Sequence, residues 1–334
     1  MIKILYCGPD GGTCRSRKNG FIAMGYDVID FTLQQNILTN LKWFQFLEQK
    51  SLNSLNLKIL NDRLLKTTKK NNPNIVWIDK GTYVYPETLS KIKDFNKNIK
   101  IVHHCTDDVE AGIHKFNNYL KSLDLYDAHF TCNEFNIDYL KKISTSNFFY
   151  NALGYDHTIF YPNDGTKKYD LCFIGHHEPQ YEKYISVATK KEINFMLGGA
   201  GWNSSKISKS KIAFSHHDEE ICPKIVSESL AGLGLYSSWN RNVYSGRVLE
   251  IPAQKTALIV KRNSFIESLY DEDSEAIFFD NSDELSSKLD EIFKDKSILK
   301  DIAHNGYKRC LANKCSWEDG MRAAINDLQS SNLI

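Results

Sequence analysis

A polar segment that runs directly into a buried strand near residue 250 constrains the fold of this chain most. Residues 245–254 (SGRVLEIPAQ) are predicted to form a brief helix, because Pro252 is poorly tolerated inside a longer one. Residues 256–261 (TALIVK) follow as an apolar run bounded by charge, which is typical of a buried strand. In α/β proteins a helix that starts beside strand ends offers backbone N–H groups to anionic ligands. The stretch therefore predicts an α/β fold with an anion site.

Two charged residues of this helix are candidates for ligand binding. Arg247 and Glu250 are three residues apart and share one helical face. An arginine can hold a diphosphate through two parallel hydrogen bonds, and a glutamate can accept hydrogen bonds from a sugar diol. The alternative is an ordinary surface ion pair between the two side chains, and composition alone favours that alternative.

The first half of the chain alternates predicted strands with helices. A helix that begins with a proline is expected at residues 86–98, and residues 37–72 are helical in pattern with an aromatic face at Trp43, Phe44 and Phe46. The four strands are expected at or within residues 2–7, 24–31, 72–81 and 99–108. This alternation predicts a Rossmann-like sheet.

A glycine-rich loop follows the first strand. Gly8, Gly11 and Gly12 do not have the GxGxxG spacing, so they predict a flexible loop and give little support for dinucleotide binding. Arg15 and Arg17 lie just after this loop as candidate ligand contacts, and the alternative is that both are solvated.

Polar and titratable residues gather at the end of the fourth predicted strand. His103, His104, Asp107 and Asp108 occupy this position, where ligands of open α/β sheets bind. A histidine can take a proton from an acceptor hydroxyl near neutral pH, and an aspartate can orient it. The cluster is thus a candidate catalytic site, and the alternative is that one histidine is packed in the core and the other is solvated.

The length and composition of the chain limit the classes of protein to which it can belong. A chain of 334 residues has room for two domains of about 150 residues each. The net charge of +1 gives no basic field that would indicate nucleic-acid binding. None of the 8 cysteines forms a CxxC pair, several lie in apolar strands, and no apolar run is long enough to span a membrane. These features favour a cytoplasmic protein with buried free thiols.

Several spaced motifs of the second half agree in order with those of one family. The chain resembles GT-B glycosyltransferases, and within them the CgeB-like branch related to the spore-maturation protein CgeB. The resemblance covers roughly residues 170–325 well and the first half loosely. The positions that carry it are Arg247, Glu250, Ala253, Glu275, Phe279, Glu284, Leu285, Ile302, Ala303 and Gly306.

The resemblance implies two Rossmann-like domains that face each other across a cleft. It implies an acceptor-binding domain at residues 1–160, a nucleotide-sugar-binding domain at 165–315, and a C-terminal helix at 316–334 that returns to the first domain. The implied acceptor side includes Gly11, Gly12 and Arg15 in the loop and His103, His104 and Asp107 as catalytic residues. The implied donor-binding residues are Gly175, Trp202, Asn242, Tyr244, Ser245, Gly246, Arg247 and Glu250, with Ser245 as a plausible N-cap.

The chain also departs from the family pattern. Retaining members carry two glutamates with seven residues between them; Glu250 matches the second, and Asn242 stands at the position of the first. His176 and His177 follow Gly175, where relatives have small polar residues, so any role for them stays open. His216, His217, Asp218 and Glu219 are adjacent, and a loop that faces the nucleotide base is a better expectation for them than a metal site.

These observations predict a glycosyltransferase that moves a sugar from a nucleotide-diphosphate donor to a hydroxyl acceptor without metal or other cofactor. Two rivals stay open: a sugar-nucleotide epimerase or hydrolase of the same fold, and a non-catalytic module that binds a nucleotide sugar. Peripheral contact with a membrane is a further open alternative, because glycosyltransferases often use lipid-linked acceptors. The donor sugar, the base, the acceptor and the oligomeric state are not indicated by the sequence.

Overall fold

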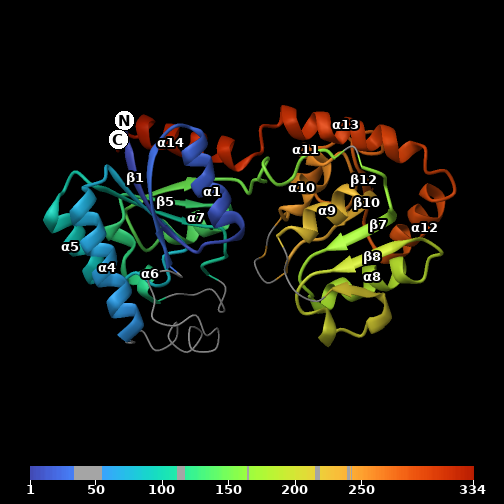
Figure 1. Ribbon diagram of the computed structural model, residues 1–334, viewed down its shortest axis with the longest axis horizontal. Helices are drawn as coiled ribbons and strands as arrows, with labels where there is room; N and C mark the ends of the chain where they lie inside the picture. Colours follow the sequence, from blue (N-terminus) through green and yellow to red (C-terminus); the bar gives the residue numbers. More distant parts are fainter. Residues whose placement is uncertain (34–54, 111–116, 164, 215–218, 239–240, 242) are drawn as a thin grey trace. The chain divides into compact units, whose positions relative to one another are not determined.

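The computed structural model of the chain describes residues 1–33, 55–110, 117–163, 165–214, 219–238, 241 and 243–334. The chain forms two compact units: Met1–Leu153 together with Trp317–Ile334, and Gly154–Ser316. Each unit is built on a parallel sheet of six strands with helices packed against it (Figure 1). The C-terminal segment therefore belongs to the first unit.

The first unit has the strand order β2-β1-β3-β4-β5-β6. Its strands are β1 (Lys3–Gly8), β2 (Asp27–Thr32), β3 (Ile75–Asp79), β4 (Lys100–Cys105), β5 (Ala128–Thr131) and β6 (Asn147–Tyr150). Its helices are α1 (Gly12–Ala23), α4 (Leu55–Asn71), α5 (Pro86–Phe95), α6 (Asn117–Lys121), α7 (Glu134–Leu140) and α14 (Trp317–Ser330). The four predicted strands and the predicted helix with an initial proline are confirmed. The structure confirms helix for residues 55–71 of the predicted helical region, and Trp43, Phe44 and Phe46 lie outside the described residues.

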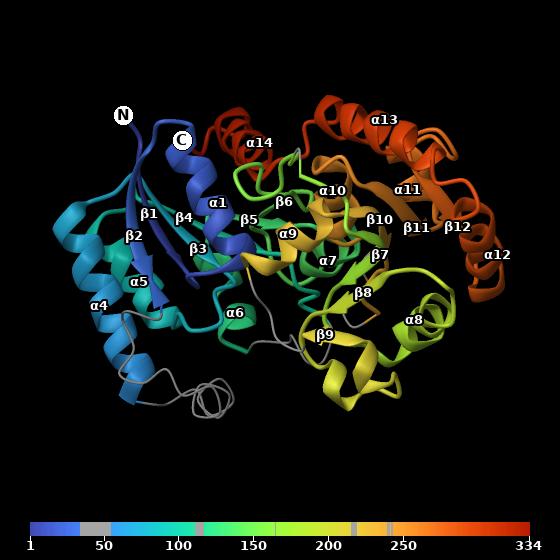
Figure 2. The same ribbon diagram turned by 45° about the vertical axis from the view of Figure 1, so that its right-hand side comes forward.

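Alternate residues of each strand feed two separate cores, as expected for a sheet covered on both faces. Leu5 and Cys7 of β1 pack with α4, α5 and α7 on one face. Ile4 and Tyr6 pack with α1 and α14 on the other face (Figure 2). The C-terminal helix α14 is thus part of the core of the first unit.

Helices α1 and α14 pack closely because α1 has a glycine at their contact. A Cβ atom on Gly20 would lie 3.2 Å from the carbonyl oxygen of Trp317. Five side chains of α14, including Met321 and Leu328, are buried against this unit. This contact ties the end of the chain to its first helix.

The second unit has the strand order β12-β11-β10-β7-β8-β9. Its strands are β7 (Tyr169–Ile174), β8 (Phe195–Gly198), β9 (Ile212–Phe214), β10 (Ser229–Gly234), β11 (Ala257–Lys261) and β12 (Ile277–Phe279). Its helices are α8 (Glu182–Thr189), α9 (Ile221–Ser227), α10 (Arg247–Ala253), α11 (Ser264–Leu269), α12 (Ser282–Ile292) and α13 (Ile298–Ala312). Helices α8 and α12 pack on the face of Ala231 and Leu233, and Ile251 of α10 packs on the opposite face, against Gly232.

The helix that contains Pro252 is brief, as predicted, with seven residues. A proline has no N–H to donate to the carbonyl of the residue four positions earlier, here Val248. The hydroxyl of Tyr270 donates to this carbonyl oxygen at 3.0 Å. A side chain from outside the helix thus replaces the missing bond.

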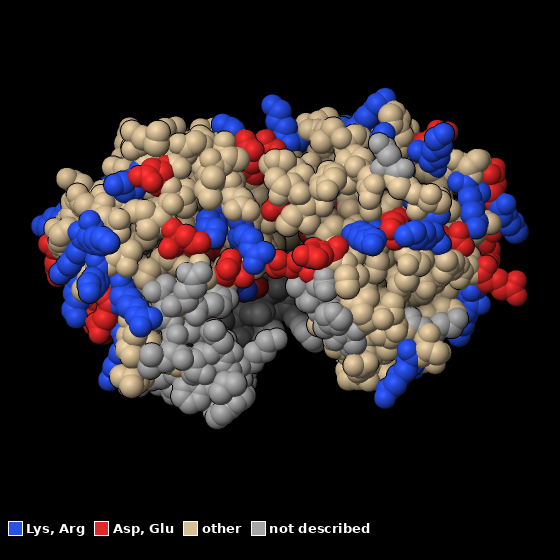
Figure 3. Space-filling model, in the orientation of Figure 1, with Lys and Arg blue, Asp and Glu red and all other residues tan. Residues whose placement is uncertain are grey.

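Several smaller expectations can be compared with the structure. All eight cysteines are free thiols, and Cys315 alone is not fully buried. Lysine, arginine and acidic side chains are interspersed on the face shown in Figure 3, which agrees with the balanced net charge. In the part of the chain that the structure describes, no helix combines the length and apolar character needed to cross a membrane.

Candidate functional site

The order of strands singles out one position in each sheet where a ligand is expected. In an open α/β sheet this position lies outside the carboxyl ends of the strands, where the strand order reverses. In the first unit the order reverses between β1 and β3, and in the second between β7 and β10. The residues that follow these four strands are therefore the candidates for binding and catalysis.

At the first of these positions the structure holds a buried ion pair. Arg17 on α1 donates from Nε to Asp79 Oδ2 and from Nη2 to Oδ1, each at 2.8 Å, and both side chains are completely buried. Tyr6 donates its hydroxyl to the same carboxylate, and the guanidinium lies 4.6 Å from the centre of the Trp317 ring. Burial alone would raise the pKa of Asp79, but Arg17 outweighs it and lowers this pKa. Arg17 therefore joins α1, β3 and α14, and neither a ligand contact nor a solvated position describes it.

The structure corrects the prediction that His103 and His104 form a catalytic base. Both imidazoles lie in β4, with exposed fractions of 2% and 0%. His103 stacks on Tyr119 and contacts the carbonyl oxygen of Lys80 through Nε2 at 3.2 Å, and Nε2 of His104 lies 3.1 Å from Asn151 Oδ1. Burial lowers the pKa of each to about 3. Both are neutral core residues at neutral pH, because they belong to the strand itself and do not follow it.

Asp107 is the member of this cluster that lies at the edge of the sheet. Its Oδ2 is 3.1 Å from Lys80 Nζ, and the two side chains are 16% and 38% exposed. Burial alone would lower the pKa of Lys80, but the carboxylate of Asp107 outweighs this effect and raises it. Lys80 has a φ of 67°, in the left-handed region that a side chain rarely adopts. Asp108 is buried and accepts from the N–H of Glu110 at 3.1 Å.

The glycine-rich loop brings the remaining residues predicted in the first unit to the start of α1. Gly11 precedes the helix, and Gly12 has a φ of 50°, which favours glycine. Arg15 is half-exposed and pairs with Asp10 at 3.2 Å. The loop lies at the carboxyl end of β1, beside the residues that follow β3.

At the second position the loop after β7 has close backbone contacts. The N–H of Gly175 donates to the carbonyl of Gly198 at 3.0 Å. Gly199 has a φ of 123°, and a Cβ atom on it would lie 2.1 Å from the carbonyl oxygen of Gly175. Trp202 is completely buried and donates from Nε1 to that oxygen at 2.8 Å. Trp202 thus supports the loop from the core, which corrects its predicted role as a direct donor contact.

The residues predicted around α10 lie at the same edge. Tyr244 is buried and stacks on Phe265 at 4.5 Å between ring centres. The hydroxyl of Ser245 donates to the carbonyl of Leu235 at 3.0 Å and does not cap the helix, whose N-cap is Gly246. The prediction of Ser245 as the N-cap is therefore wrong. Asn242 lies outside the described residues, as do His216, His217 and Asp218.

Arg247 and Glu250 form an ion pair with each other, so the alternative of an intrahelical pair is present in the structure. Their side chains are 20% and 13% exposed, which is less than an ordinary surface pair. The bond uses one N–H group of the guanidinium, which has five donors. The pair therefore occupies only part of the hydrogen-bonding capacity of Arg247.

A buried glutamate that sequence reasoning did not single out joins the two loops at this edge. Glu178 is 0% exposed and follows His176 and His177 in the loop after β7. Its Oε2 accepts from the N–H of Ser238 at 3.2 Å and from the hydroxyl of Ser238 at 3.3 Å, in the loop after β10. Gln180 also donates to this carboxylate, and His176 Nε2 lies 2.7 Å from Oε1. The sequence feature that could have indicated this site is a glutamate two residues after a histidine, just beyond the end of a predicted strand.

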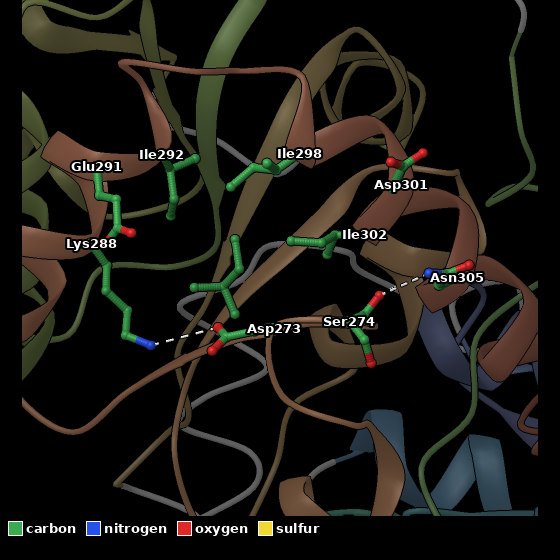
Figure 4. A pocket seen from close by; sticks show the side chains of 10 residues that line it. Asp273, Ser274, Lys288, Glu291, Ile292, Ile298, Asp301, Ile302 and Asn305 are labelled. Carbon is green, nitrogen blue, oxygen red and sulfur yellow. Dashed lines mark hydrogen bonds and ion pairs between the residues drawn. The ribbon is translucent and has the colours of Figure 1, made fainter.

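Some hollows of the second unit lie elsewhere. One of about 570 Å³ is bounded by α12 and α13, and the side chains that line it include Ile292, Ile298, Ile302, Asp273, Lys288 and Asp301 (Figure 4). It also touches Ile277, the first residue of β12, so it lies at the amino ends of the strands. This location differs from the carboxyl edge where the candidate residues gather.

No group of three or more metal-ligating side chains is found within the ranges that the structure describes. The contacts of the histidines at the two candidate edges include carboxylate, amide and carbonyl oxygens.

Two Rossmann-like units, with the C-terminal helix packed in the first, define the GT-B fold. Sucrose-phosphate synthase from Thermosynechococcus elongatus has a similar structure, with a TM-score of 0.67 at 12% identity over 99% of both chains. HepE from Anabaena in complex with UDP-glucose gives 0.66 at 10% identity over 99% of this chain and 100% of that one. A putative UDP-N-acetylglucosamine 2-epimerase from Listeria monocytogenes gives 0.56 at 12% identity, over 99% and 96%. At these identities the likenesses establish the fold.

A family model described as glycosyl transferase-like matches residues 182–325. The matched range is less than half of the chain and lies almost entirely in the second unit. It includes Arg247 and Glu250. A search of curated proteins gives no match.

Proposed function

We propose that this chain is a glycosyltransferase that transfers a sugar from a nucleoside-diphosphate sugar to a hydroxyl acceptor. The observation that carries the proposal is the match of residues 182–325 to a glycosyl transferase-like family, in the unit that holds the Arg247–Glu250 pair at a sheet edge. The crystal structure of HepE with UDP-glucose supports a donor of this class, because that protein has the same fold.

The donor diphosphate is assigned to the second unit. The guanidinium of Arg247 neutralises its negative charge with the N–H groups that Glu250 does not use. Glu250 orients the guanidinium and accepts hydrogen bonds from the hydroxyls of the ribose. A Cβ atom on Gly199 would lie 2.1 Å from the carbonyl oxygen of Gly175, so glycine at position 199 lets the loop after β7 lie close to the loop after β8. No metal or other cofactor is part of this proposal.

The acceptor is assigned to the first unit, with Asp107 as the group that takes the proton. The acceptor oxygen forms a bond to the anomeric carbon of the donor, and the bond from that carbon to the diphosphate oxygen breaks with its electron pair on the phosphate. The hydroxyl proton passes to the carboxylate of Asp107, which Lys80 holds in place. His103 and His104 are excluded from this step by their burial within the unit.

The test of the proposal is thermal unfolding against UDP-, GDP-, dTDP-, CDP- and CMP-linked sugars and the free nucleotides. A ligand that binds the folded chain raises the melting temperature. A shift with one nucleotide family, followed by transfer of the sugar to an added acceptor, is the expected result. Binding of no member of the panel would overturn the proposed donor class.

A second candidate is a hydrolase or epimerase that acts on the donor alone. The similarity in fold to the putative UDP-N-acetylglucosamine 2-epimerase favours this alternative. An enzyme of that kind converts the sugar nucleotide at full rate without an acceptor, whereas a transferase is accelerated by one. A chain that binds the donor and never converts it is the non-catalytic module considered above.

A further inference from the structure

We propose that His176, held by the buried Glu178, is a proton-dependent contact for the diphosphate of the donor. The inference rests on the proposed function and assigns roles to His176, which the family resemblance leaves open, and to Glu178. In this scheme His176 touches the substrate, and Glu178 is a positioning residue. The imidazole binds the diphosphate as a cation, so binding depends on pH.

The first step of the argument is the place of the carboxylate. Glu178 lies between the loops after β7 and β10, the two strands at which the order of the second sheet reverses. It is completely buried, whereas the imidazole of His176 above it is 51% exposed. The dyad thus has a fixed, buried end and an accessible end at the edge where a ligand of this fold is expected.

The second step is the charge of the carboxylate. Burial alone would raise the pKa of Glu178, but hydrogen bonds from Ser237, His176, Gln180 and Ser238 outweigh it and lower this pKa. A buried carboxylate is costly unless it is paired, and the ion pair of Glu178 in the described part of the chain is with His176. His176 is therefore the side chain placed to pair with this buried carboxylate.

The third step is the identity of the proton that changes. A carboxylate only accepts hydrogen bonds, so His176 Nε2, 2.7 Å from Glu178 Oε1, carries a proton in both forms of the ring. Protonation then adds the second N–H, at Nδ1. This N–H can donate to a phosphate oxygen as the bond from the anomeric carbon breaks and its electron pair remains on that oxygen.

The fourth step concerns the other titratable groups near the dyad. The hydroxyl of Tyr181 donates to Glu178 Oε1 at 3.2 Å, and its ring centre lies 6.3 Å from that of His176. Burial, and then Glu178, raise the pKa of Tyr181, so it stays neutral at physiological pH. His177 points to a different carboxylate, Glu182, at 2.8 Å. His176 is therefore the side chain of this group that combines an accessible ring with a fully buried carboxylate partner.

His177 provides a matched control. It also pairs with a glutamate, but it is 12% exposed and its ring lies 5.1 Å from the buried Trp202. The two histidines are adjacent in sequence and differ in exposure and in partner. H177Q therefore removes an imidazole–glutamate pair of the same kind without changing the proposed contact.

The experiment is calorimetric binding of UDP-glucose, GDP-mannose, dTDP-glucose and CDP-glucose to the full chain at pH 5.5, 6.5, 7.5 and 8.5. Nucleotide sugars are used because a terminal phosphate has a pKa of about 6 and would itself titrate in this range. We expect the sugar nucleotide that binds to lose about tenfold in affinity from pH 5.5 to 8.5, as the imidazolium loses its proton. H176Q should bind with the weak affinity of the high-pH form at every pH.

E178Q and H177Q complete the test. E178Q removes the negative charge beneath the imidazole, so the loss of affinity should begin at a lower pH than in the wild type. H177Q should keep the wild-type profile. A pH-independent affinity in the wild type, or a profile abolished by H177Q and kept by H176Q, would overturn the inference and leave the proposed function intact. No binding of any nucleotide sugar at any pH would overturn both.

Discussion

Asp79 in the first unit and Glu178 in the second are both fully buried carboxylates at the carboxyl edge of a parallel sheet, and their partners differ. Asp79 is paired with Arg17, which is equally buried and always charged. Glu178 is paired with His176, which is half-exposed and can lose its charge. The comparison shows that the exposure and chemistry of the partner decide whether a buried carboxylate joins helices to a sheet or prepares a group for a ligand.

The largest expected effect comes from replacing each carboxylate by its amide. D79N leaves the guanidinium of Arg17 buried without a counter-charge, and breaking a buried pair in this way costs about 3–5 kcal/mol. E178Q leaves an imidazole that can become neutral, so the expected loss is about 1 kcal/mol. Urea-induced unfolding followed by circular dichroism measures both. Equal losses for the two variants would contradict the distinction between a structural and a functional carboxylate.

Arg247 offers an intermediate case, because its pair with Glu250 is partly exposed. If it holds the donor diphosphate, R247A should weaken binding of the nucleotide sugar about thirtyfold, or roughly 2 kcal/mol, with little change in stability. Calorimetric titration gives the affinity. R309A is the control, since Arg309 also pairs with a glutamate, Glu275, but lies on α13 away from the candidate edge. Unchanged affinity in R247A would remove this residue from the proposed site.

A buried histidine of the first unit extends the comparison to the stability of the protein in acid. Burial lowers the pKa of His103 to about 3, whereas an unfolded histidine takes up its proton near pH 6.5. The unfolded state then binds more protons, so the free energy of unfolding falls as the pH decreases below about 6.5, by about 1.4 kcal/mol per pH unit for each such histidine. H103F keeps an aromatic ring stacked on Tyr119 and removes one titratable imidazole. The slope should therefore fall by about 1.4 kcal/mol per pH unit. Urea unfolding at pH 6.5, 5.5 and 4.5 measures the slope, and an unchanged slope in H103F would contradict the assignment.

Local sequence patterns predicted most of the elements and less of the sites. Buried strands and amphipathic helices follow from periodicity, which involves neighbouring residues. The pairs Arg17–Asp79 and Glu178–Ser238 join residues 62 and 60 positions apart, and only the strand order brings them together. His103 and His104 were misassigned for a related reason: they lie within a buried strand, and proximity to its polar end suggested exposure. The uninterrupted run IVHHC was the signal of their burial.

The smallest predicted effect concerns α10, where a side chain from outside the helix bonds to the carbonyl that Pro252 leaves without a donor. The hydroxyl of Tyr270 donates to the carbonyl of Val248, which lacks its helical donor because of Pro252. Y270F should therefore destabilise the second unit by about 1 kcal/mol. In a P252A background the restored N–H can donate to the same carbonyl, so Y270F should cost less than it does in the wild type. A double-mutant cycle of unfolding free energies measures this coupling. Equal costs in the two backgrounds would show that Tyr270 stabilises α10 by packing and not by replacing the bond that Pro252 removes.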